Sequence, residues 1–209
     1  MIPSPVRHVL AKLRTSLSPT EREFRRLWPL IDSVEGFLVS PDQERWLFRT
    51  ARSLPEEARI VEVGSFKGRS TCCLAYGCLD SKKRVFAVDT FNGNRVDFPA
   101  RNFFDEFSRN LEERGLARYV KVLAGLSVEL AKSWDGPIHL LFIDGSHQYD
   151  EVLADFHGFF PHVVPDGIIA LHDVTDTWPG PQKVWDEVVR PRLHHVGYCS
   201  TLAFGRKAG

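Results

Sequence analysis

The sequence has no net charge and no long apolar run. Its 209 residues include 27 Lys and Arg and 27 Asp and Glu, so the formal charge is zero. Nucleic-acid-binding domains usually carry a basic excess, so we expect no DNA or RNA partner. No apolar run reaches the roughly 18 residues that span a bilayer, and the N-terminus lacks the apolar core of a signal peptide. These absences predict a cytoplasmic protein without a transmembrane segment.

Cysteine is scarce as well. The four cysteines are Cys72, Cys73, Cys78 and Cys199, and they lack the paired spacing of metal ligands. The first three fall in one segment of small and apolar residues, which predicts a buried helix. We therefore expect reduced cysteines in the core, as is usual in cytosolic proteins.

The first part of the chain predicts helices ahead of the main domain. Residues 1–17 place apolar side chains at helical spacing beside three basic residues and no acid. This pattern suits an appended helix, a frayed terminus, or a basic amphipathic helix for a membrane surface or a partner subunit. Capping boxes with proline at the first helical position start at Ser18 and Ser40. We expect residues 1–34 to form a helical extension that could mediate a homo-oligomer, ahead of a domain over residues 35–209.

The most informative stretch is 60–70, which reads IVEVGSFKGRS. An apolar, β-branched run over 58–63 predicts a buried strand that ends at Gly64. A second glycine, Gly68, precedes a helix of small residues that begins at Ser70. Strand, glycine turn and helix together are how parallel α/β sheets open a nucleotide-type site. The spacing Glu-x-Gly-x-x-x-Gly differs from the Gly-x-Gly-x-x-Gly of dinucleotide binders, which speaks against an NAD-dependent oxidoreductase.

Apolar runs alternate with amphipathic segments through the rest of the chain. Such alternation predicts an α/β fold with a doubly wound, mostly parallel, Rossmann-like sheet that helices cover on both faces. One of the expected helices directs Phe103, Phe104 and Phe107 toward the core. Further strands are expected over 84–90, 119–124, 138–143 and 168–173, with two short closing strands near 197–201 and 202–206.

Polar residues stand where each expected strand ends. Ligands of open α/β sheets bind outside the carboxyl ends of the strands, so we expect these residues to gather at one edge. An acid at the end of the second strand is the usual partner of ribose hydroxyls. The strand-end residues are Glu62, Gly64, Asp89, Ser127, Asp144, His147, His172 and Asp173.

Four segments resemble, in order and spacing, those of class I S-adenosylmethionine-dependent methyltransferases. They are VEVGSFKGRS at 61–70, DTFNG at 89–93, IDGSHQY at 143–149 and LHDV at 171–174. The resemblance covers roughly 35–207 and is greatest to the small-molecule and sugar O-methyltransferases that carry the I-D-G-x-H and H-D-V motifs. It implies a methyltransferase-type sheet with a closing antiparallel strand. It also implies methyl transfer from S-adenosylmethionine to a hydroxyl of a small-molecule acceptor such as a sugar, a glycoside or a phenolic compound.

The resemblance further implies which residues bind the cofactor. Glu62 would hold its amino end, Ser70 its carboxylate and Asp89 its ribose hydroxyls, while the two glycines admit its methionine part. Ser127 and its neighbours would line the adenine, although serine at this place also suits a turn. The cofactor-binding residues implied are Glu62, Gly64, Ser65, Gly68, Ser70, Asp89, Ser127 and Asp144.

The catalytic residues implied are His147 and Asp144. Catechol-type relatives place a lysine base near the position of His147, and a histidine with an ordinary pKa of about 6.5 suits proton abstraction near neutrality. The alternative is a loop histidine that caps the following helix. A non-catalytic interaction protein that keeps this fold is a further alternative, which the intact strand-end acids oppose.

A divalent metal is a further expectation at Asp144, His172 and Asp173. In catechol-type relatives three oxygen-bearing side chains at these strand ends bind magnesium. Here His172 replaces one oxygen ligand, and imidazole suits borderline ions better than magnesium. The sequence therefore leaves three alternatives open: Mg²⁺, Mn²⁺, or no metal. Without a metal, the two acids would hold the loops by hydrogen bonds.

Overall fold

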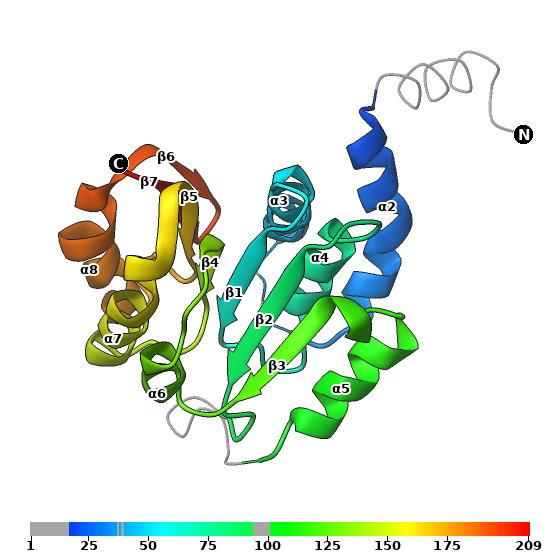
Figure 1. The fold of residues 1–209 in the computed structure, drawn as a ribbon, viewed down its shortest axis with the longest axis horizontal. Coiled ribbons are helices and arrows are strands. Elements are labelled where there is room, and N and C mark those ends of the chain that lie inside the picture. Colours follow the sequence, from blue (N-terminus) through cyan, green and yellow to red (C-terminus); the bar gives the residue numbers. More distant parts are fainter. Residues whose placement is uncertain (1–16, 37, 39, 94–100) are drawn as a thin grey trace, which may run out of the picture.

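The computed structural model describes residues 17–36, 38, 40–93 and 101–209. Within them, seven strands form one sheet in the order β3-β2-β1-β4-β5-β7-β6 (Figure 1). The first five strands pair in parallel, and β7 lies antiparallel between β5 and β6. The strands are β1 (Arg59–Val63), β2 (Arg84–Asp89), β3 (Val120–Ala124), β4 (Ile138–Ile143), β5 (Val163–Leu171), β6 (Leu193–Cys199) and β7 (Leu202–Lys207).

This architecture confirms the doubly wound, mostly parallel sheet with a closing antiparallel strand. The parallel strands read as continuous apolar runs because helices cover both of their faces. The first closing strand was expected near 197–201, but β6 begins at Leu193 and includes a register shift between His194 and Gly197. The amphipathic pattern of residues 1–16 lies outside the described residues.

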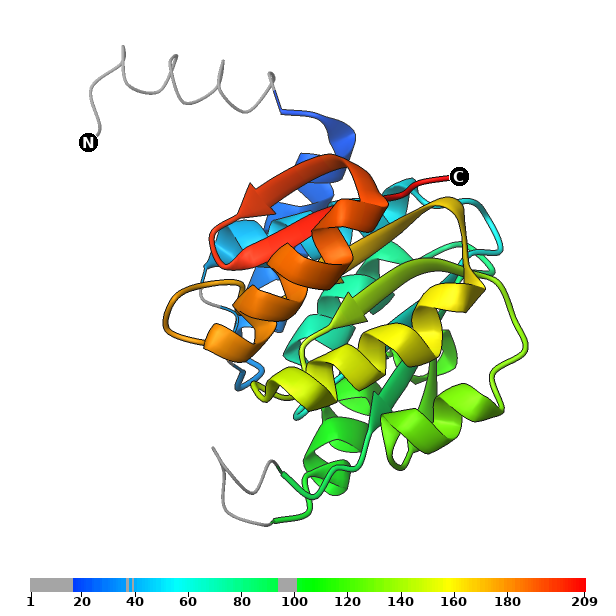
Figure 2. The ribbon, with the colours of Figure 1, turned by 90° about the vertical axis from the view of Figure 1, so that its left-hand side faces the viewer.

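Helices α2 to α5 lie on one side of the sheet, and α6 to α8 lie on the other (Figures 1 and 2). Each side has its own apolar core, because each strand points alternate side chains to opposite faces. The helices are α2 (Pro19–Asp32), α3 (Pro41–Ser53), α4 (Arg69–Gly77), α5 (Phe104–Glu113), α6 (Ser127–Lys132), α7 (Tyr149–Phe159) and α8 (Pro179–Val184).

Helix α2 packs into the same core as the sheet. Phe24, Leu27 and Ile31 are buried together with side chains of α3, α4 and the central strands. Of the two capping boxes, the first is confirmed, since the Ser18 hydroxyl accepts a hydrogen bond from the amide of Glu21 at 3.2 Å. The second marks the start of α3 as expected, but its capping hydrogen bond is absent, since the hydroxyl of Ser40 makes no hydrogen bond within the described residues.

Other expectations about the core are mostly met. Phe103 and Phe107 are buried, but Phe104 begins α5 with its side chain 38% exposed, so its expected inward position is wrong. All four cysteines are free; the three near α4 are buried and Cys199 is partly buried. Among the described residues, no helix is long and apolar enough to cross a membrane.

Candidate active site

The carboxyl ends of β1, β2, β4 and β5 hold two adjoining groups of polar side chains. One group surrounds the glycine turn after β1, and the other joins the loops after β4 and β5. The two meet at Gly64, which has φ +88° and whose added Cβ would lie 2.2 Å from the carbonyl oxygen of Asp144. Only glycine allows the backbones to come this close, so the ends of β1 and β4 are fixed against each other.

Glu62 holds the glycine turn from below. Its fully buried carboxylate accepts hydrogen bonds through Oε2 from the hydroxyls of Ser65, at 2.9 Å, and Thr71. Burial raises the pKa of Glu62 to about 7, with the surrounding hydroxyls partly offsetting this effect. Within the described residues its other oxygen, Oε1, is buried without a hydrogen-bond partner, so the site keeps one acceptor available.

Asp89 holds the same turn from the side. Its Oδ2 accepts from the backbone amides of Ser65 at 2.7 Å and Phe66 at 2.8 Å, and its Oδ1 accepts from the amide of Phe91 at 2.7 Å. The sequence did not predict these hydrogen bonds between Asp89 and the turn. A carboxylate has about four lone-pair sites, so Asp89 keeps acceptor capacity, and its expected contact with ribose hydroxyls stays a prediction.

Helix α4 starts at this turn. Gly68, with φ +92°, is its N-cap, and Ser70 is buried in the first turn. The preceding residue, Arg69, donates through Nε to Oε1 of Glu44 at 2.6 Å, and Glu44 on α3 is wholly buried. A helix N-terminus presents unpaired amides that favour an anionic group, which fits the expected carboxylate site at Ser70.

Ser127, the first residue of α6, lies beside α7. Its hydroxyl donates to Oδ1 of Asp155, a side chain only 6% exposed. Burial raises the pKa of Asp155 to about 6. Asp155 was missed from the sequence, because an acid in the middle of a helical pattern looks like an exposed residue. The expected contact of Ser127 with adenine stays a prediction.

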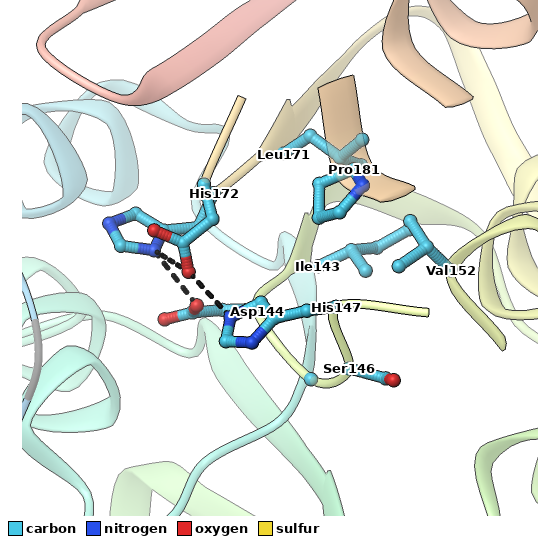
Figure 3. A pocket seen from close by; sticks show the side chains of 10 residues that line it. Ile143, Asp144, Ser146, His147, Val152, Leu171, His172 and Pro181 are labelled. Atoms are coloured by element: carbon cyan, nitrogen blue, oxygen red, sulfur yellow. Dashed lines mark hydrogen bonds and ion pairs between the residues drawn. The ribbon is translucent and has the colours of Figure 1, made fainter. Parts of the chain in front are cut away.

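The second group contains the expected catalytic and metal-binding residues. Nε2 of His147 lies 2.9 Å from Oδ2 of Asp173. Nδ1 of His172 lies 3.0 Å from Oδ1 of Asp144 and 3.1 Å from the same Oδ2 of Asp173. Figure 3 shows the side chains of His172, Asp144 and His147 turned toward one another. The structure therefore brings all four residues into one cluster.

The charges of this cluster are strongly coupled. Burial alone would lower the pKa of His172, but Asp144 and Asp173 outweigh burial and raise it to about 10. Burial would raise the pKa of Asp173, but the hydrogen bond with His147 and the adjacent His172 imidazole outweigh burial and hold the pKa well below its usual range. The point between the carboxylates and the imidazole thus requires a cation, either a proton or a metal ion.

The donor set fits a divalent metal. The donor atoms are Oδ1 of Asp144, Nδ1 of His172 and Oδ2 of Asp173. Neighbouring ligands of a six-coordinate ion with bonds of about 2.1 Å lie about 3 Å apart, which matches these separations. Neither carboxylate is aligned for a hydrogen bond with Nδ1, which is a buried polar atom without a hydrogen-bond partner in the described part of the chain.

Trp178, at the end of the loop after β5, and Gly180, in the first turn of α8, fix His147. The indole of Trp178 stacks on the imidazole with ring centroids 3.7 Å apart and planes 20° apart. Gly180 packs so closely that an added Cβ would lie 2.1 Å from the carbonyl oxygen of His147. The imidazole is thereby held between Asp173 at its edge and Trp178 on its face, in a fixed orientation.

Comparisons with known proteins point to methyltransferases. A family model described as "Methyltransferase domain" matches residues 61–174. Demethylmacrocin O-methyltransferase of Streptomyces fradiae is 42% identical over 171 residues, which are 79% of this chain and 39% of that protein. The chain spans between 17% and 39% of the length of three curated relatives that it matches.

Solved structures show the same fold. The O-methyltransferase TomG from Streptomyces achromogenes, in complex with SAM, has a TM-score of 0.65 at 17% identity over 97% of this chain and 96% of that chain. An O-methyltransferase from Bacillus cereus in complex with SAH has a TM-score of 0.63 at 20% identity over 96% and 97%. At these identities the likeness concerns the fold.

Proposed function

Since the chain belongs to the methyltransferase-domain family that matches residues 61–174, we propose that it is an S-adenosylmethionine-dependent O-methyltransferase acting on a small molecule. The observation that carries this proposal is the cluster of His147, Asp173, His172 and Asp144 beside the glycine turn. The contact between Gly64 and the backbone of Asp144 places the two groups next to each other.

The glycine-turn group would hold the cofactor, which supplies an electrophilic methyl group on a sulfonium centre. The free acceptor atom of Glu62 suits the amino end, directly or through a water. The start of α4 at Ser70 suits the carboxylate, and Asp89 suits the ribose hydroxyls. These assignments, with Ser127 toward the adenine, are part of the proposal, and the Asp89 assignment is tested below.

His147 would act as the general base. With Asp173 ionised, the Nε2 proton of His147 faces the carboxylate, and the lone pair is on Nδ1. The proton of the acceptor hydroxyl would pass to Nδ1, which leaves the oxygen as a nucleophile. Asp173 would then stabilise the imidazolium, and Trp178 would keep the ring in orientation.

A divalent ion held by Asp144, His172 and Asp173 is the second part of the proposal. It would lower the pKa of an acceptor hydroxyl bound to it and would orient that hydroxyl. The nitrogen ligand favours Mn²⁺ or another borderline ion at least as much as Mg²⁺.

The acceptor we propose is a hydroxylated small molecule such as a sugar, a glycoside or a phenolic compound. The similarity to an enzyme named for demethylmacrocin supports this class. In the structure the indole of Trp178, beside His147, is a flat surface on which a sugar or aromatic ring could stack. Cytoplasmic residence, a homo-oligomer and a separate role for residues 1–34 stay predictions.

The test has two stages. Titration calorimetry should show binding of S-adenosylhomocysteine and no tighter binding of NAD. Incubation with methyl-labelled S-adenosylmethionine and fractionated metabolites should then label a small molecule in an alkali-stable ether linkage. Tighter binding of NAD, or label found only on nitrogen or carbon, would contradict the proposal.

A further inference from the structure

The two ring nitrogens of His172 face opposite surroundings. Nδ1 faces the carboxylates of Asp144 and Asp173, as described above. Nε2 faces Oε1 of Gln43 at 3.4 Å and Oγ1 of Thr201 at 3.5 Å. The imidazole is 3% exposed and Gln43 is wholly buried, so this contact is closed to bulk water.

The orientation of the Gln43 amide is set by a third contact. Its Nε2 donates to Oγ1 of Thr201 at 2.9 Å, so the amide nitrogen is directed to the turn between β6 and β7. The amide oxygen is thereby left facing His172. A carbonyl oxygen can only accept, so Nε2 of His172 must carry a proton. A neutral imidazole protonated on Nε2 has its lone pair on Nδ1, toward the two carboxylates.

We propose that Gln43 is a positioning residue that prepares His172 to bind a metal ion through Nδ1. Thr201 assists by fixing the amide of Gln43. The inference rests on the metal site proposed above and adds Gln43 and Thr201, which contact the ring nitrogen of His172 that faces away from the metal. Groups that bond the outer nitrogen of a metal-binding histidine typically change metal affinity by about 10- to 100-fold.

Gln43 lies in a part of the chain that the family model does not match. Gln43 belongs to α3, and Thr201 follows β6, so both lie outside the matched residues 61–174. They reach His172 from sequence separations of 129 and 29 residues. Two elements that the family match does not include would thus prepare one ligand of the metal site.

The experiment measures Mn²⁺ binding to the full chain by electron paramagnetic resonance, without cofactor or acceptor. Gln43→Leu removes the acceptor and should weaken Mn²⁺ binding about 10- to 100-fold. Gln43→Glu keeps an acceptor oxygen and should bind Mn²⁺ within a few-fold of wild type or more tightly. Gln182→Leu is the matched control and should have no effect, since Gln182 on α8 donates to Asp186 in the helical turn that follows.

S-adenosylhomocysteine affinity, measured on the same samples, separates local from global effects. It should stay within about two-fold in Gln43→Leu, because the glycine-turn group is unchanged. Thr201→Val keeps the shape of the side chain and should weaken Mn²⁺ binding less than Gln43→Leu does. It provides a second test of the inference if Gln43→Leu does not fold. Unchanged Mn²⁺ binding in Gln43→Leu, when His172→Ala has lost it, would overturn the inference.

Two further results would overturn it. One is an equal loss in Gln182→Leu. The other is a wild-type protein that binds S-adenosylhomocysteine but no Mn²⁺, which would leave the proposed methyl transfer standing. Loss of S-adenosylhomocysteine binding in the wild type would instead contradict the proposed function itself.

Discussion

His147 and Asp173 are joined through Nε2 and Oδ2 at 2.9 Å, and the same oxygen lies 3.1 Å from Nδ1 of His172. The proposed base and the proposed metal site therefore share one carboxylate oxygen. A change at Asp173 should affect both, so it cannot tell them apart. His147 and Asp144 belong to only one of the two and can be tested separately.

His147→Ala should lower kcat by about 10²- to 10⁴-fold, because the acceptor hydroxyl loses its base. Affinities for S-adenosylhomocysteine and Mn²⁺ should stay within a few-fold, which calorimetry can check. His157→Ala, at an exposed position of α7, is the control and should keep full activity. A fully active His147→Ala enzyme would assign proton removal to another group.

Removal of divalent ions should abolish methyl transfer. Dialysis against a chelator followed by titration with Mn²⁺ or Mg²⁺ should restore the rate, with Mn²⁺ at least as effective because of the imidazole ligand. Asp144→Ala should reproduce the effect of the chelator without rescue by either ion. Activity that survives the chelator would limit Asp144 and His172 to fixing the loops.

Asp89→Ala should weaken S-adenosylhomocysteine binding by at least about ten-fold. The variant loses the expected partner of the ribose and also the acceptor for the backbone amides of Ser65, Phe66 and Phe91, each a hydrogen bond of about 1 kcal/mol. Urea unfolding should accordingly show lower stability. Asp135→Ala changes an exposed acid in the loop between α6 and β4 and should alter neither quantity. Unaltered affinity in Asp89→Ala would remove Asp89 from the cofactor site.

Arg69→Met should lower the free energy of unfolding by roughly 3–5 kcal/mol, because it leaves the buried carboxylate of Glu44 without its cation. The double variant Arg69→Met, Glu44→Met should recover much of this loss. Arg25→Met removes an exposed guanidinium that pairs with Glu21 and is the control for charge removal. Chemical unfolding of the four proteins provides the comparison. Equal stability of Arg69→Met and wild type would show that the pair contributes nothing.

Asp155 should make stability depend on pH. Its pKa is raised from 3.8 to about 6 in the folded protein, so the folded state binds the proton more tightly than the unfolded state. The stability gained from this proton is present below pH 4 and is lost as pH rises to about 6. A rise of this size in the pKa corresponds to about 3 kcal/mol. Asp155→Asn should lack this loss, so its stability advantage over wild type should grow between pH 4 and 7 in urea unfolding. A pH-independent difference would exclude the effect.

Most of the sheet, and the meeting of polar residues at the carboxyl ends of β4 and β5, could be predicted from the sequence. The strands are apolar runs, and their ends carry Asp144 and His172, whose meeting follows from the parallel order alone. Local patterns were less reliable where tertiary contacts decide. The segment from Ser40 has the sequence of a capping box, but the Ser40 hydroxyl makes no capping hydrogen bond. Phe104 was expected in the core, but it begins α5 at the surface.

Contacts between distant segments could not be predicted. Asp155 is buried because Ser127 on another helix meets it, and Gln43 reaches Thr201 across 158 residues. A sequence pattern records the period of one element and not the partner against which it packs. The residues behind the site therefore had to come from the structure.

Gln43 and Glu44 are neighbours on α3 and are both wholly buried. The first faces His172 at the end of β5, and the second binds Arg69 at the start of α4. This one helical turn, outside the matched residues 61–174, thus contacts both His172 at the metal-site cluster and Arg69 at the end of the glycine turn. A chimera in which a relative's segment replaces the first 58 residues should be active only if that segment also places Gln and Glu at these two positions. Otherwise His172 and Arg69 lose their partners on α3.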